Sequence, residues 1–63
     1  MKHQVIDVLA SYLEAVPQQV LAWDEKVINH FVANPGTFNQ FKQSNDYERW
    51  DIYSSIRYAL RPS

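Results

Sequence analysis

The sequence predicts a small all-α domain, built of three principal helices and one additional short helix. Long segments place apolar residues at the spacing of an amphipathic helix. Helix-breaking residues separate these segments at Pro17, at Asn34-Pro35-Gly36 and at Ser44-Asn45-Asp46. The single glycine disfavours a β-sandwich or barrel, which needs many tight turns. With 63 residues, the chain is expected to form one domain over residues 1–63.

The first helix is predicted from Lys2 to near Ala15 or Val16. Its apolar residues share an arc of roughly 160° on a helical wheel. These residues are Val5, Ile6, Val8, Leu9, Tyr12, Leu13 and Val16. A second helix should begin at Pro17, because proline disfavours helical backbone in the residue before it and is tolerated at a helix start.

The second helix is predicted to run to about Ala33, where Asn34-Pro35-Gly36 should end it. A short third helix is predicted from Phe38 to Gln43. It should be opened by Thr37, because Thr37 and Gln40 have the spacing of a capping box.

The last helix is predicted from about Asp46 to Leu60, with a cap provided by Ser44, Asn45 or Asp46. Residues 50–60 also alternate between apolar and polar side chains, as in a strand. A helix is preferred because the chain has no second strand candidate to pair with this segment. In a dimer the strand could pair with its symmetry mate, so this alternative stays open.

The predicted core combines the apolar faces of all four helices. Its members are Val5, Leu9, Tyr12, Leu13, Val20, Trp23, Val27, Phe31, Phe38, Phe41, Trp50, Ile56 and Leu60. Asp24 falls within the apolar arc of the second helix, where an unpaired carboxylate would be costly. We predict a structural ion pair between Asp24 and Arg57, with Arg49 as the alternative partner, because arginine pairs well with carboxylates at such sites. Asp24 could instead face a partner chain.

Neither catalysis nor a cofactor or metal site is predicted. The chain has no cysteine, and its two histidines, His3 and His30, lie on different predicted helices without a nearby sequence partner. A single glycine excludes the phosphate-binding glycine loops. Because the constellations of acid–base and nucleophilic catalysis are missing, an enzyme is not expected.

The last helix carries the main functional lead, because Tyr, Trp and Arg are enriched at binding hot spots. The candidate partner-binding residues are Tyr47, Arg49, Trp50, Tyr53, Arg57 and Tyr58. The chain is interpreted as a non-enzymatic protein-binding module, a regulator or inhibitor that occupies a surface of a larger protein. A small core without disulfides also predicts self-association, commonly as a homodimer.

Two other functions are considered. Residues 38–60 have the outline of a helix-turn-helix DNA-binding regulator. However, Asp46, Glu48 and Asp51 open the candidate recognition helix against Arg49 alone, and the net charge of −1 gives no attraction to nucleic acid. The third candidate is a structural or assembly subunit.

A cytoplasmic location without membrane attachment is expected. The sequence has no apolar stretch long enough to span a bilayer, no signal-peptide pattern and no cysteine.

Overall fold

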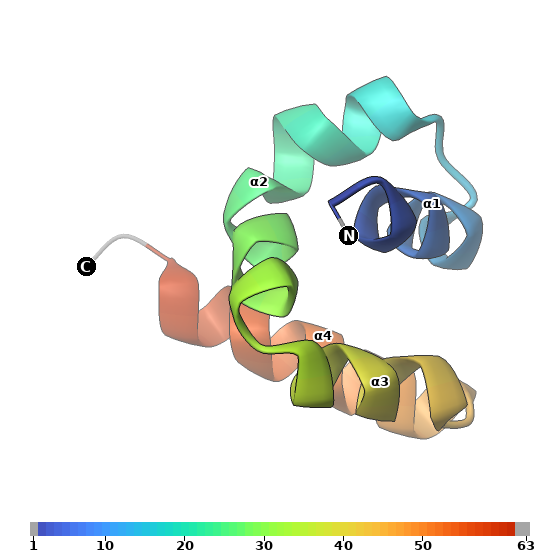
Figure 1. Ribbon diagram of the computed structural model, residues 1–63, viewed down its shortest axis with the longest axis vertical. Coiled ribbons are helices and arrows are strands. Elements are labelled where there is room, and N and C mark those ends of the chain that lie inside the picture. The colour runs from blue at the N-terminus through green and yellow to red at the C-terminus, as the bar shows by residue number, and fades with distance from the viewer. Residues whose placement is uncertain (1, 62–63) are drawn as a thin grey trace.

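Four helices make up the fold in a computed structural model, which describes residues 2–61 (Figure 1). They are α1 (Lys2–Leu13), α2 (Pro17–Ala33), α3 (Pro35–Gln43) and α4 (Asp46–Leu60). Within residues 2–61 there is no strand, which confirms the all-α prediction. The strand alternative for residues 50–60 is wrong, because this segment is continuous helix within α4.

The predicted bounds of α2 and α4 match the structure, and the local contacts show why. Pro17 is the first residue of α2, and the preceding Val16 has an extended backbone with φ −80° and ψ 153°. At the start of α4, the side-chain oxygen of Asn45 accepts a hydrogen bond from the backbone N–H of Glu48 at 2.9 Å. This bond satisfies a donor that the first turn of a helix leaves unpaired.

α1 ends at Leu13, earlier than the predicted end near Ala15 or Val16. Glu14 has a φ of 54°, a left-handed conformation that cannot continue a right-handed helix. The chain then turns toward Pro17, and the Ala15 N–H donates to the Ala10 carbonyl oxygen at 3.0 Å.

α3 begins three residues earlier than predicted, and the proposed capping box is wrong. Pro35 starts the helix after Asn34, so Thr37 lies inside it, and the Phe38 N–H donates to the Asn34 carbonyl oxygen at 3.1 Å. Pro35 has no N–H to leave unpaired in the first turn, and Gly36 does not adopt a positive φ. The Pro-Gly pair therefore opens the third helix as well as following the second.

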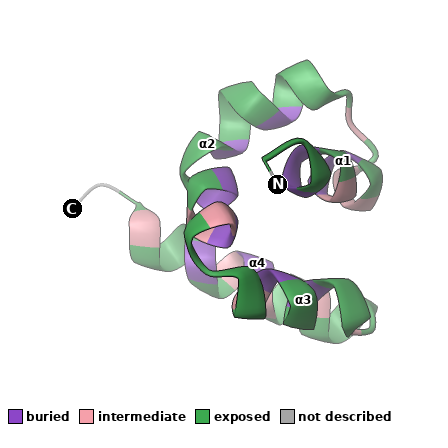
Figure 2. Cartoon of the chain, viewed as in Figure 1, coloured by how far each residue is buried: buried purple, intermediate pink, exposed green. Residues whose placement is uncertain are grey.

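α2 is the central element and contacts each of the other three helices. α1 packs against it, and α3 and α4 lie side by side and run in opposite directions (Figure 1). The buried residues lie on the inward sides of the helices (Figure 2). Within the core, α2 and α3 meet through the ring of Phe31, whose centroid lies 5.6 Å from that of Phe38 and 5.2 Å from that of Phe41.

Most of the predicted core is buried, with some changes in membership. Tyr12, Leu13 and Leu60 are only partly buried and pack against the core. Four further side chains are buried that the predicted core omitted, and they are Ile6, Ala10, Ile28 and Tyr53.

The prediction that Trp23 and Trp50 belong to the core is wrong. Each is 59% exposed. Both residues lie at or beyond the edge of their helix's apolar arc, and a wide arc is buried only where a neighbouring helix covers it. In this four-helix arrangement no neighbour covers these two edges.

α2 is kinked at Asp24, whose φ of −131° and ψ of 33° are not helical. No proline or glycine lies at this position, so the kink has another cause. The kink lies at the one buried charged side chain among the described residues, and this side chain is part of the candidate site.

No helix in the described part of the chain has the length and apolar character needed to cross a membrane.

Candidate functional site

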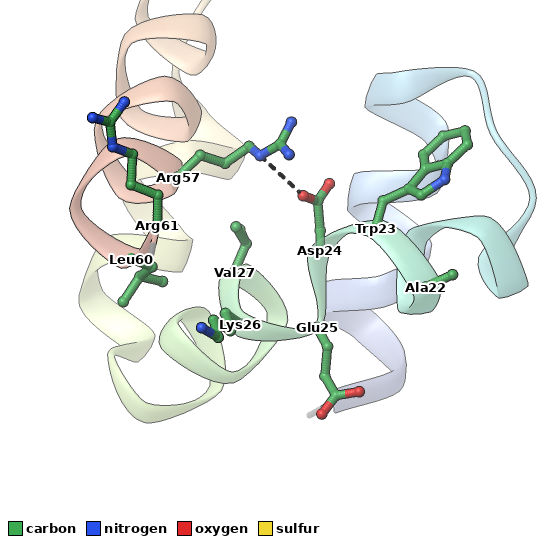
Figure 3. A pocket seen from close by; sticks show the side chains of 9 residues that line it. All are labelled: Ala22, Trp23, Asp24, Glu25, Lys26, Val27, Arg57, Leu60 and Arg61. Carbon is green, nitrogen blue, oxygen red and sulfur yellow. Dashed lines mark ion pairs between the residues drawn. The ribbon is translucent and has the colours of Figure 1, made fainter. Parts of the chain in front are cut away.

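Asp24 connects α2 to α4 from inside the protein. Its carboxylate oxygen Oδ2 accepts a hydrogen bond from the Tyr53 hydroxyl at 2.5 Å. Its other oxygen, Oδ1, lies 3.3 Å from Nε of Arg57 in an ion pair, drawn as the dashed line in Figure 3. The structure thus brings Asp24 and Arg57 together, as the sequence suggested, and adds Tyr53.

The two members of this ion pair differ strongly in exposure. The Asp24 side chain is 1% exposed, whereas that of Arg57 is 55% exposed and reaches over the carboxylate from the solvent side. Oδ1 makes no hydrogen bond within residues 2–61, so its contact with Arg57 is a charge contact only. The short bond from Tyr53 is therefore the main polar link between α2 and α4.

Burial, together with the hydrogen bond to Asp24 and the negative charge of Asp24, raises the pKa of the Tyr53 hydroxyl from 10.0 to about 12. The hydroxyl consequently stays protonated and donates to Asp24 over the whole physiological pH range. Tyr53 was predicted to bind a partner, but it is buried and takes a structural role. Its place four residues before Arg57 is a signal that could have indicated this, because side chains four apart share a helix face.

Arg49 also has a structural role and does not pair with Asp24. Its guanidinium donates to the Phe41 carbonyl oxygen at 3.0 Å and to the Lys42 carbonyl oxygen at 2.7 Å. The last carbonyls of a helix have no partner within that helix, and the planar fork of arginine reaches two of them at once. Arg49 thus joins α4 to the end of α3, and its prediction as a partner-binding residue finds no support in these contacts.

Three large aromatic side chains, Tyr47, Trp50 and Tyr58, are exposed on α4. We call them the aromatic face. Their exposed fractions are 87%, 59% and 71%. Tyr47 and Tyr58 lie on the side of α4 opposite the buried Ile56, and Trp50 lies at the edge of the apolar arc beside them. The guanidinium of Arg61 lies 4.9 Å from the centre of the Tyr58 ring. This arrangement combines apolar rings with flanking arginine, the composition of a binding hot spot.

A groove of about 400 Å³ runs beside this face, between α2 and the C-terminal half of α4. Trp23, Asp24, Val27, Arg57, Leu60 and Arg61 are among its lining residues. Figure 3 shows Arg57 reaching across toward Asp24, while the Glu25 side chain points away from Arg57. The groove is therefore lined by the exposed indole ring of Trp23 and by the side chains of Arg57 and Arg61. The sequence did not predict this groove.

Residues 2–61 contain no group of three or more His, Cys, Asp or Glu side chains placed to hold a metal ion. α3 and α4 run in opposite directions (Figure 1). The first turn of α4 carries Asp46 and Glu48, which repel phosphate.

Comparison with protein-family models, with curated proteins and with solved structures gives no match for this chain.

Proposed function

We propose that the protein is a small non-enzymatic module that binds another protein through the aromatic face. Such a module acts by covering a surface, which is the mode of a regulator or inhibitor. The proposal places it in the cytoplasm, for which the absence of cysteine is suitable.

The exposure of Tyr47, Trp50 and Tyr58 together on one helix is the observation that supports this proposal. Each ring removed from water contributes hydrophobic free energy to association, and an aromatic side chain loses little conformational entropy when it is immobilised. The rigid position of α4 adds to this. Arg49 and Tyr53 fix the helix from its inner side, so the outer rings are held in place before a partner arrives.

Site-specific crosslinking tests the proposal. The photoreactive residue p-benzoylphenylalanine would replace Tyr58 in one variant and Gln18, an exposed residue of α2, in the control. We expect protein adducts from position 58 and none from position 18, and we expect a second change, Trp50→Ala, to abolish them. Equal labelling from both positions would contradict the proposal.

The Trp50→Ala and Tyr58→Ala variants must remain folded for this test to be valid. Because both side chains are largely exposed, their melting temperatures should stay close to that of the unchanged protein. A collapse of the fold would place these rings in the core instead.

A further inference from the structure

We propose that the partner of the aromatic face is a second copy of this chain, bound with α4 antiparallel to α4 around a two-fold axis at Ser54. The inference rests on the proposed function, because it names the partner of the same surface. Three observations on α4 and the adjacent groove carry it.

The first observation is the symmetry of the exposed residues about Ser54. Trp50 and Tyr58 lie four residues to either side of it, and Tyr47 and Arg61 lie seven residues to either side. With a rise of about 1.5 Å per residue, an antiparallel copy brings Trp50 to the height of Tyr58 and Tyr47 to the height of Arg61. Serine at the centre is small enough to let the two helices approach closely.

The second observation is the separation of charge along the exposed side of α4. On the side of α4 that carries Ser54, the exposed acids Asp46 and Asp51 lie in the N-terminal half, whereas the exposed arginines Arg57 and Arg61 lie at the C-terminal end. An antiparallel pair places each acidic half against a basic half, and a parallel pair would place like charges together. Asp46 and Arg61 share one flank of the helix, so the antiparallel copy brings them into range of each other twice.

The third observation is a protruding ring that matches a nearby hollow. Trp50 and Arg57 are seven residues apart and so lie on the same side of α4. In the antiparallel pair, Trp50 of one copy reaches the height of Arg57 of the other, where the groove of about 400 Å³ opens. Its indole can stack on the Arg57 guanidinium and contact Trp23, which gives both exposed tryptophans a covered position.

The expected dimer is small and of moderate affinity. Full burial of an aromatic side chain removes about 150–250 Å² from water. Because the three rings are already partly buried, with exposed fractions of 87%, 59% and 71%, each copy would supply on the order of 400 Å². Doubled, this is below the standard range for stable interfaces before the groove residues are added. Dissociation in the micromolar range is expected, and a larger protein that uses the same face would compete with the dimer.

Sedimentation equilibrium over micromolar to millimolar concentrations tests the inference directly. The unchanged chain should reach twice its monomer mass, and Trp50→Ala should raise the dissociation constant at least tenfold. Leu21→Ala is the matched control, because Leu21 is an exposed apolar residue of α2 outside the groove lining, and it should leave the constant unchanged. A monomer at every concentration, or a Trp50→Ala variant that dimerises as well as the unchanged chain, would overturn the inference.

A charge exchange tests the antiparallel register without altering any aromatic ring. Asp46→Lys and Arg61→Glu should each weaken self-association, since each sets like charges opposite each other in both symmetric contacts. An equimolar mixture of the two variants should recover dimers, because the mixed pair has opposite charges at both contacts. Failure of the mixture to exceed the separate variants would refute this register.

These outcomes separate the inference from the proposed function. A chain that stays monomeric while position 58 still crosslinks to a different protein rejects the dimer and supports the proposed function. A dimer and crosslinks that are both insensitive to Trp50→Ala reject both.

Discussion

Changing Tyr53 to Phe would remove the hydroxyl that donates to Asp24 at 2.5 Å and leave the buried carboxylate with Arg57 as its remaining polar contact. A hydrogen bond to a charged group contributes about 1.5–3 kcal/mol, so we expect Tyr53→Phe to lower the free energy of unfolding by about 2 kcal/mol. A chain of this size is expected to have a total stability of only about 3–9 kcal/mol. The change should therefore be large enough to measure easily.

Asp24→Ala removes the other member of the bond and should cost about 2 kcal/mol, because the Tyr53 hydroxyl then lacks its acceptor. From the sequence, a larger loss of several kcal/mol is expected if Arg57 is left buried and alone. The structure corrects that reasoning, since the Arg57 side chain is 55% exposed and water can hydrate it. The double variant should lose less than the two single changes together, with a coupling of about 1–2 kcal/mol.

Urea unfolding followed by circular dichroism on the four proteins of this cycle measures these values. Asp24→Asn serves as a control that keeps the size of the side chain and removes its charge. Single losses within about 0.5 kcal/mol, or strictly additive losses, would show that the Tyr53–Asp24 bond does not hold α2 against α4.

Three further predictions concern the same framework. Folding raises the pKa of Tyr53 from 10.0 to about 12, so the stability that the protonated hydroxyl contributes is complete below pH 10 and should be lost between about pH 10 and 12. Urea unfolding at increasing pH should show this loss of stability, and the Tyr53→Phe variant should not show it. Arg49→Lys keeps the charge but cannot reach both carbonyl oxygens, so thermal melts should show a loss of about 1 kcal/mol, and an unchanged melt would exclude the two-bond link to α3. Gly36→Ala should stabilise the protein by about 0.4–1 kcal/mol, since the φ of Gly36 is not positive and an added Cβ meets no atom within 4 Å. Thermal melts measure this change, and a destabilised variant would show that Gly36 does not adopt helical backbone at the start of α3.

Asp24 illustrates how far sequence reasoning reached into the site. A carboxylate in an apolar helical arc must have a partner, which made the pairing with Arg57 predictable. The role of Tyr53 was not predicted, because a tyrosine at the edge of an arc can turn inward to a polar partner or outward to solvent. The kink at Asp24 was also not predicted, because no proline or glycine marks it in the sequence.

The two tryptophans also show that the sequence does not determine which side chains a neighbouring helix covers. Hydrophobicity and helical phase suggested that Trp23 and Trp50 are buried, but burial requires a neighbouring element, and helical periodicity says nothing about which flank that element covers. Their exposure creates the groove wall and part of the aromatic face, so the candidate site lies where the prediction of the core failed.

The sequence by itself determined the all-α class, the bounds of α2 and α4, and most of the buried residues. These features depend on short-range rules, namely helical periodicity, proline geometry and capping, which act within one or two turns of the chain. Only the tertiary structure decided that Tyr53 and Arg49 face inward, that Trp23 and Trp50 face solvent, and that a groove lies beside α4. Those outcomes depend on which helix covers which flank, and that is set by packing between segments far apart in the sequence.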